Sequence, residues 1–213
     1  MHIDIKSEHL RALTHLAAKT DVRKNINGVW IEASRNTILI AMSGPGLGAI
    51  DTGVEASERF AVMVPHGILD RLKKVKGDVT FSSDDGKKWT ATHLSETLAW
   101  FDDGLKLLDW RRVLPRSASG EAAHLDLGLL DSFVKAAKDL TRARTPSLCV
   151  LIGHNGEGTS LIHFAGQPKF IGGLMPRRLG AIKPGSLLSA PAWATHAPLR
   201  GAPATVEVEC DLA

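Results

Sequence analysis

The feature that most constrains this chain is a set of short segments that recur, in the same order, in its second half. His2–Ile5 returns as His124–Leu127, and Thr37–Ile40 returns as Thr159–Ile162, each 122 residues later. Two further matches pair Phe60–Pro65 with Phe170–Pro176 and Trp89–His93 with Trp193–His196. A repeated order of strand-like and helix-like segments indicates an internal duplication. We therefore expect two related domains.

The composition between the two copies marks the boundary. Pro115–Glu121 is polar and contains Gly, Ser and Pro, which is typical of a connection between domains. We expect a first domain over residues 1–116, a linker over 117–123 and a shortened second domain over 124–213. A length of 213 residues can accommodate two such domains.

The overall composition indicates a globular protein of a reducing compartment. Hydrophobic residues make up 44% of the chain, which is enough for a core. No apolar run approaches the roughly 20 residues of a membrane-spanning helix, and the first residues alternate polar and apolar instead of forming a signal peptide. Two cysteines, Cys149 and Cys210, cannot supply a disulfide framework. We expect a cytoplasmic protein with no membrane contact.

Period-two and helical patterns predict the same order of elements in both copies. In the first copy we expect strands at residues 3–5, Gly28–Ala33, Thr37–Met42, Phe60–Val64, Val79–Ser82 and Trp89–His93, and helices over Ser7–Lys19 and His66–Val75. Ser7 is the expected N-cap of the first helix. Strand Phe60–Val64 is expected to end at Pro65.

The second copy contains the best helical pattern of the chain. Leu130, Phe133, Val134, Ala137 and Leu140 share one face of a helix. Around that helix we expect strands at His124–Leu127, Leu148–Ile152, Thr159–Phe164, Phe170–Leu174 and Thr205–Cys210, and a short helix over Arg177–Ile182 that Pro184 ends. The predicted class is α+β, with helices on one side of antiparallel sheets.

This order of elements, repeated in tandem, resembles the DNA sliding clamp family, above all the bacterial DNA polymerase III β subunit. The segments that carry the resemblance are Ile3–Leu10, Val22–Val29, Asp109–Pro115 and Leu174–Leu179. It implies tandem clamp domains with sheets outside and helices on the inner face. It also implies a non-catalytic processivity factor without a cofactor, which encircles or contacts double-stranded DNA and tethers a replicative polymerase or other clamp-binding proteins.

The chain departs from the bacterial pattern in the number of domains. A bacterial clamp has three domains per chain and this sequence has room for two, so the resemblance implies a homo-oligomeric ring. A trimer would supply six domains, and a dimer is the alternative; a two-domain format is phage-like. Met175 and Pro176 have two interpretations. They belong either to a pocket for partner peptides or to a strand end with a turn proline, matching Val64–Pro65 of the first copy.

The resemblance gives the basic residues around the helices a role in DNA contact. A net charge of +3 is mild, but twelve of the 26 Lys and Arg residues group around three predicted helices. The expected DNA-binding residues are Arg11, Lys19, Arg23, Lys24, Arg71, Lys73, Lys74, Lys76, Lys135, Lys138, Arg142 and Arg144. Lys and Arg bind phosphates without reading sequence, as sliding requires. The alternative is that these residues are solvated helix faces.

Other motifs favour structural roles. Gly44–Gly48 lacks the spacing of a phosphate-binding loop and reads as a turn between strands. Asp84-Asp85 and Asp102-Asp103 each precede a glycine and read as turns, and His15 reads as a solvated histidine. No metal-ligand spacing occurs. Two alternatives to a clamp remain, namely a clamp-derived binding module or regulator that forms no ring, and an unrelated small enzyme.

Overall fold

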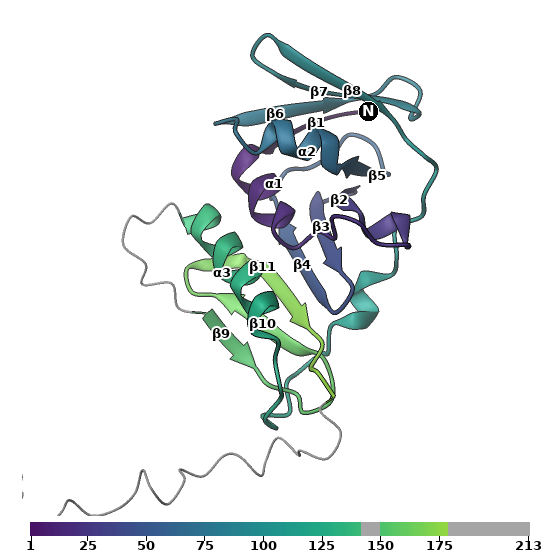
Figure 1. Cartoon of the computed structure of the whole chain (residues 1–213). Helices are drawn as coiled ribbons and strands as arrows, with labels where there is room; N and C mark the ends of the chain where they lie inside the picture. The colour runs from purple at the N-terminus through teal and green to yellow at the C-terminus, as the bar shows by residue number, and fades with distance from the viewer. Residues whose placement is uncertain (142–149, 179–213) are drawn as a thin grey trace, which may run out of the picture.

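The strands of the protein form two antiparallel sheets, with helices against one face of the larger sheet (Figure 1). The computed structural model describes residues 1–141 and 150–178. Within these ranges α1 and α3 lie side by side, and α2 lies beneath the smaller sheet (Figure 1). The predicted α+β class is confirmed.

The smaller sheet has the strand order β1-β6-β7-β8. Its strands are β1 (His2–Lys6), β6 (Asp78–Ser82), β7 (Lys88–His93) and β8 (Glu96–Phe101). Strands β1, β6 and β7 confirm the prediction, whereas β8 is an additional strand. It escapes the period-two pattern because it lies at the edge of the sheet, where Trp100 is its one buried side chain. Trp100 lies opposite Trp89 of β7, and the two rings stack.

The larger sheet has the strand order β5-β2-β3-β4-β11-β10-β9. Its strands are β2 (Gly28–Ala33), β3 (Ile38–Ser43), β4 (Gly46–Asp51), β5 (Phe60–Pro65), β9 (Val150–Gly153), β10 (Ser160–Phe164) and β11 (Gln167–Leu174). The ladder between β4 and β11 joins the two halves of the chain into one sheet. The prediction of a turn over Gly44–Gly48 is wrong beyond residue 45, because Gly46 and the residues after it pair in β4.

The strand order supports one of the sequence matches between the two halves and contradicts another. β3 and β10 each form the middle strand of a three-stranded meander, so Thr37–Ile40 and Thr159–Ile162 hold equivalent positions. Phe60–Pro65 and Phe170–Pro176 do not, because β5 pairs with β2 whereas β11 pairs with β4 and β10. Apolar strands of different position share similar residues, which explains the mistaken match.

The first two helices are shorter than predicted. α1 covers Ser7–Thr14 and α2 covers His66–Leu72. α1 stops early because the amide of Ala18 donates to the carbonyl of Met42 in β3 instead of continuing the helix. Ser7 is the first helical residue, and the N-cap is Lys6, whose backbone is extended. The amide of Ser7 donates to the carbonyl of Gly77.

The third helix, α3 (Leu127–Thr141), confirms the strongest helical pattern of the sequence. Phe133, Ala137 and Leu140 are buried as predicted. The strand expected at His124–Leu127 does not form: residues 124–126 have no regular structure, and the carboxylate of Asp126 accepts hydrogen bonds from the first amides of α3. β1 has β6 as a ladder partner, and this segment has none among the described residues.

Several predicted features of the second half lie outside the described residues. They are residues 148–149 of a predicted strand, the predicted strand Thr205–Cys210, the match Trp193–His196, both cysteines and the end of the predicted helix Arg177–Ile182. Arg177 and Arg178 are described and are not helical.

Two glycines allow α1 and α3 to pack closely on the joined sheet. Gly48 of β4 lies opposite Gly172 of β11 in the ladder. A Cβ atom at Gly48 would overlap the side chain of Leu16, and a Cβ atom at Gly172 would lie 2.5 Å from a ring carbon of Phe133. Both positions therefore require glycine for space rather than for a turn.

The opposite face of the larger sheet is covered by residues 105–114. Trp110 is buried there with Trp30 of β2. Its ring Nε1 donates to Glu32 at 3.0 Å, and Arg111 pairs with the same carboxylate at 2.9 Å. This cover explains why β2 and β3 are apolar on both faces. The following residues are also attached to the second half, because Gly120 and Glu121 exchange backbone hydrogen bonds with His154 and Gly156.

Candidate nucleic-acid interface

A groove of about 640 Å³ runs between the three helices, on the side away from residues 105–114. Its lining residues are Arg11, Thr14, His15, Ala17, Lys19, His66, Asp70, Lys73, Ser132 and Lys135. α1 and the residues after it supply five of these, and α2 and α3 with their ends supply the rest. The groove thus exists because β4 and β11 join, which places α3 beside α1.

The groove brings together four of the twelve predicted DNA-binding residues. They are Arg11, Lys19, Lys73 and Lys135. Two histidines, His15 and His66, and one carboxylate, Asp70, complete its charged and titratable lining. The balance of formal charge is positive, so the groove can attract a polyanion although the whole chain is nearly neutral.

Two of the groove lysines form ion pairs within one helix or at its end. Lys73 Nζ lies 2.7 Å from Asp70, and Lys135 Nζ lies 2.6 Å from Asp131. The hydrogen bonds from these lysines lower the pKa of the Asp70 and Asp131 carboxyls. Lys19 forms no ion pair with any residue in ranges 1–141 and 150–178, so its ammonium is the most available to a ligand.

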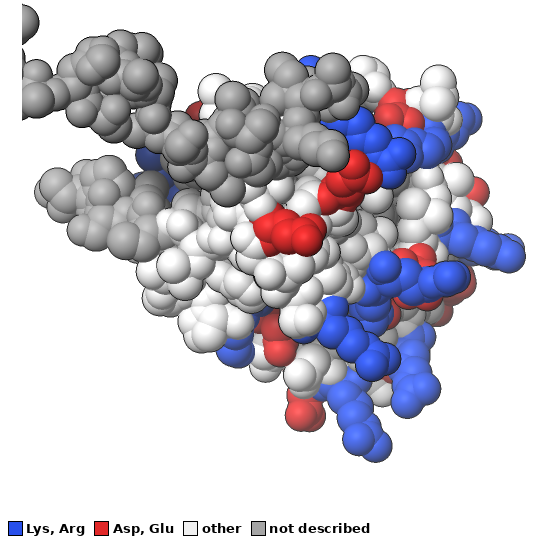
Figure 2. Space-filling view, turned by 90° about the horizontal axis from the view of Figure 1, so that it is seen from below, with Lys and Arg blue, Asp and Glu red and all other residues white. Residues whose placement is uncertain are grey.

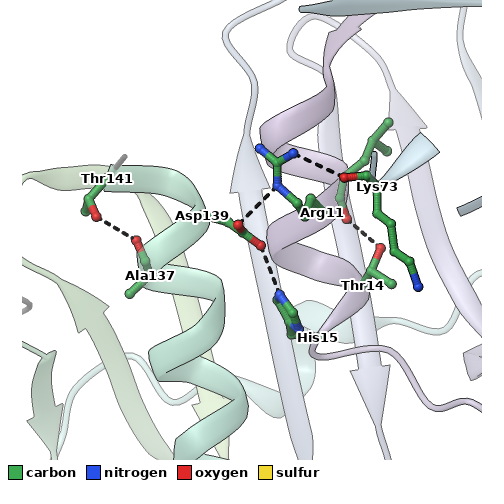
Figure 3. Close-up of polar contacts among 8 residues, drawn as sticks. Arg11, Thr14, His15, Lys73, Ala137, Asp139 and Thr141 are labelled. Carbon is green, nitrogen blue, oxygen red and sulfur yellow. Dashed lines mark hydrogen bonds and ion pairs between the residues drawn. The ribbon is translucent and has the colours of Figure 1, made fainter. Parts of the chain in front are cut away.

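Arg11 connects the three helices (Figure 3). Its Nε donates to Asp139 of α3 at 3.0 Å, and its Nη1 donates to the carbonyl of Lys73, at the end of α2, at 3.2 Å. His15 Nε2 donates to the second oxygen of the same Asp139 at 2.9 Å (Figure 3). His15 is solvent-exposed, as the sequence predicts, but it also has a carboxylate partner. Its partner is 124 residues away in the sequence, so no local pattern could reveal it.

The other predicted DNA-binding residues lie outside the groove lining. Arg23 and Lys24 belong to the loop after α1 and to the 3-10 helix Lys24–Ile26. Arg23 pairs with Asp21 and lowers the pKa of that carboxyl to about 2. Arg71 pairs with Glu96 of β8 at 2.8 Å. Lys74, Lys76 and Lys138 are exposed and do not line the groove. Arg142 and Arg144 lie outside the described residues.

Sequence reasoning missed four polar residues of the groove, Thr14, His66, Asp70 and Ser132. His66 was assigned to a helix start. The structure shows its Nε2 donating to the carbonyl of Ala18 at 2.6 Å, which ties α2 to the end of α1. A lone histidine, serine or threonine carries no sequence signal for such a role. Only the packing of the three helices brings these side chains to one groove.

Basic side chains are unevenly distributed over the rest of the surface. In the view from below, Lys and Arg gather toward one side of the molecule, and the centre of that face is mostly uncharged (Figure 2).

Arg111 lies over the ring of Trp110, with 4.3 Å between the guanidinium carbon and the ring centroid. A cation placed over an indole ring is attracted by its π-face.

Met175 and Pro176 follow the end of β11. Met175 is 47% exposed, and its amide donates to the carbonyl of Pro45 at 2.8 Å. The neighbouring Gly173 packs against Leu114 of the segment that covers the sheet. The two residues thus lie where the outer cover, the turn before β4 and the end of β11 meet.

The two acidic pairs differ in geometry: Asp84-Asp85 lies in the bend between β6 and β7, as predicted, whereas the turn predicted at Asp102-Asp103 does not form. Asp85 accepts hydrogen bonds from the amides of Lys87 and Lys88, and these bonds lower the pKa of its carboxyl. The amide of Asp102 donates to the carbonyl of Lys87 at the end of the β7–β8 hairpin.

Within residues 1–141 and 150–178, no three His, Cys, Asp or Glu side chains gather so that they could hold a metal ion. Nor does any helix in these ranges have the length and apolar character to cross a membrane.

Comparison of the fold with solved structures identifies bacterial sliding clamps. The β subunit of DNA polymerase III from Pseudomonas aeruginosa matches with a TM-score of 0.65 and 17% identity, over 84% of this chain and 67% of that one. The β subunit from Thermotoga maritima matches with a TM-score of 0.65 and 12% identity, over 84% and 66%. The β subunit from Borrelia burgdorferi, in complex with a natural product, matches with a TM-score of 0.64 and 17% identity, over 84% and 65%.

The comparisons show the fold. No protein-family model matches the chain, and no curated protein matches it in sequence. The chain spans about two thirds of the length of the clamp subunits it matches. It has the sliding-clamp fold, as its sequence resemblance implied.

Proposed function

We propose that this protein is a non-catalytic, clamp-like subunit that holds duplex DNA against the groove between α1, α2 and α3 and tethers a polymerase there. The single observation that carries the proposal is the groove itself. On a sliding-clamp fold, it gathers Arg11, Lys19, Lys73 and Lys135 from segments far apart in the sequence. Arginine and lysine side chains that bind phosphates do so independently of the base sequence.

The first prediction concerns two lysines of the groove, Lys19 and Lys135. Changing Lys19 and Lys135 together to alanine is expected to weaken duplex binding roughly tenfold per lost phosphate contact at 0.1 M salt. The slope of log affinity against log salt should become shallower by about 0.9 for each contact. Fluorescence anisotropy of a labelled duplex over a salt series measures both quantities.

A matched control removes two lysines elsewhere. Lys87 ends the connection between β6 and β7 and Lys88 is the first residue of β7, and neither belongs to the groove lining. Changing both to alanine makes the same change in net charge. If this control lost as much affinity and slope as the groove variant, binding would follow net charge alone, and the groove would have no special role.

A clamp needs further copies of the chain, and the open edge of β8 offers a place for one. Residues Thr97–Phe101 of this edge carry no charge, whereas β1, at the other edge, exposes His2, Asp4 and Lys6. Edge strands are usually protected by charges or prolines because their free amides invite pairing. We infer that β8 receives an antiparallel strand from the next chain, so that a trimer, or else a dimer, forms a ring.

The second prediction tests this edge. Asp102 donates to Lys87, so by the period of the ladder the amide of Ala99 points away from β7. Ala99→Pro removes that outward donor while the β7 ladder remains. We expect wild-type oligomers and a monomeric variant by light scattering. Circular dichroism should show the same fold for both. A wild-type protein that is monomeric at high concentration would contradict ring formation.

A second candidate function is a clamp-derived module that binds partners without encircling DNA. It is favoured by the ion pairs of Arg11, Lys73 and Lys135, which already have aspartate partners. Retention on nicked circular DNA, combined with loss from linear DNA, would distinguish a ring from such a module.

The proposal includes the organisation and surroundings of the chain. We propose two clamp-like units over residues 1–116 and 124–213, joined by 117–123, and a cytoplasmic location. We also propose that partner peptides dock near Met175 and Pro176. The exposed Met175 beside Pro45 supports this last point.

A further inference from the structure

We propose that Asp139 is a latch between α3 and α1 which competes with bound phosphate, so that occupation of the groove loosens α3. The inference deepens the proposed function, since it takes the phosphates of DNA as the competing ligand. Both oxygens of the Asp139 carboxylate are used, one by Arg11 at 3.0 Å and one by His15 at 2.9 Å (Figure 3).

The latch crosses from one half of the chain to the other. Arg11 and Asp139 are 128 residues apart, and Arg11 also holds the carbonyl of Lys73. By contrast, Asp70 and Asp131 pair with lysines three and four residues further along the chain. Asp139 is therefore the carboxylate that ties α3 to the first two helices.

The position of Asp139 is unfavourable for the helix that carries it. Asp139 lies in the last described turn of α3 (Leu127–Thr141), and a negative charge near the C-terminal end of a helix opposes the helix dipole. An aspartate at this site is compensated by its contacts with α1. Asp139 therefore stabilises the junction between α3 and α1, whereas its charge alone would destabilise α3.

Phosphate can take the place of this carboxylate. Arg11 and His15 both line the groove, and Asp139 leaves them partly exposed, at 28% and 36% of their side-chain surface. A phosphate presents oxygens that accept from arginine and histidine as a carboxylate does, and arginine binds both types of group well. Once phosphate holds these donors, Asp139 faces an anion and is repelled.

The layer beneath the latch limits the resulting movement. The ladder between β4 and β11 remains, and Phe133 stays packed on Gly172. Loosening is therefore expected in the last turn of α3, around Asp139, rather than across the sheet. The latch makes the seating of α3 depend on whether the groove is occupied.

Hydrogen exchange of α3 amides in the full chain tests this coupling. With wild-type protein, adding a 30-base-pair duplex should speed exchange in the last turn of α3 by about threefold to fivefold, as expected for the loss of partly exposed ion pairs. In Asp139→Asn, exchange should already be fast without DNA and should not rise further. Its DNA affinity should increase, by roughly tenfold at 0.1 M salt for one added phosphate contact.

The asparagine variant separates a latch from a local helix effect. Removing a negative charge from the end of α3 would by itself slow exchange there, so faster exchange points to the lost contact with α1. Asp131→Asn is the matched control. It frees Lys135 within the same helix, and exchange at the end of α3 should still respond to DNA as in the wild type.

The outcomes divide cleanly. If DNA binds the wild type and α3 exchange does not rise, or if Asp139→Asn gains no affinity, the latch is overturned while the DNA-binding proposal stands. If neither protein binds DNA, inorganic pyrophosphate is the second probe. Faster α3 exchange with pyrophosphate in the wild type would support the latch and overturn DNA as the ligand, and no change would overturn the latch as well.

Discussion

Replacing Phe133 with alanine is expected to lower the free energy of unfolding by about 3–5 kcal/mol, the usual cost of truncating a buried phenylalanine. Phe133 is almost fully buried between α3 and β11. Its ring packs edge to face on that of Phe170, with 6.3 Å between the ring centroids. Without it, α3 loses its main anchor on the joined sheet. Urea unfolding followed by circular dichroism measures the change.

The control for this prediction lies on the same helix. Leu127, at the start of α3, is 81% exposed, so Leu127→Ala should change stability by no more than about 0.5 kcal/mol. Similar losses for both variants would mean that α3 is not held by Phe133.

Adding a side chain at Gly172 is expected to destabilise the protein from the opposite direction. Gly172→Val should cost about 1–3 kcal/mol because the new atoms would overlap Phe133, in a core that cannot expand without strain. Gly67→Ala serves as the control, since nothing lies within 4 Å of the added Cβ in α2. The control should leave stability unchanged or slightly increase it.

The two substitutions should compensate each other. In the double variant, the valine at position 172 occupies space that Phe133 has vacated, so the combined loss should be smaller than the sum of the single losses. Residues in contact commonly show coupling of about 0.5–3 kcal/mol. Strict additivity in the same urea experiment would show that Phe133 and Gly172 do not share a packing site.

The sequence indicated much of the fold through local periodicity. The helical spacing of Leu130, Phe133 and Leu140 predicted α3, and alternation predicted most of the strands. Its errors fall where tertiary contacts override local pattern. β8 is an edge strand with one buried residue, and α1 ends early because Ala18 donates to Met42. The segment at His124–Leu127 has strand-like alternation but no ladder partner among the described residues.

The candidate site was less accessible to sequence reasoning. Twelve basic residues around the helices were predicted to contact DNA, and the structure gathers four of them in one groove while pairing several with aspartates. Formal charge and helical spacing report which side chains are basic and on which face of a helix they lie. They do not report whether a carboxylate from another element has already engaged them.

By itself, the sequence determined the class of fold, the resemblance to clamps and the candidate cations, because each depends on residue type and on spacing within a few turns. The tertiary structure decided which cations share a groove and which of them carry a partner. The ladder between β4 and β11 sets α3 beside α1, and this brings Asp139 to Arg11 across 128 residues. Contacts of that range depend on how the elements pack, which no local periodicity encodes.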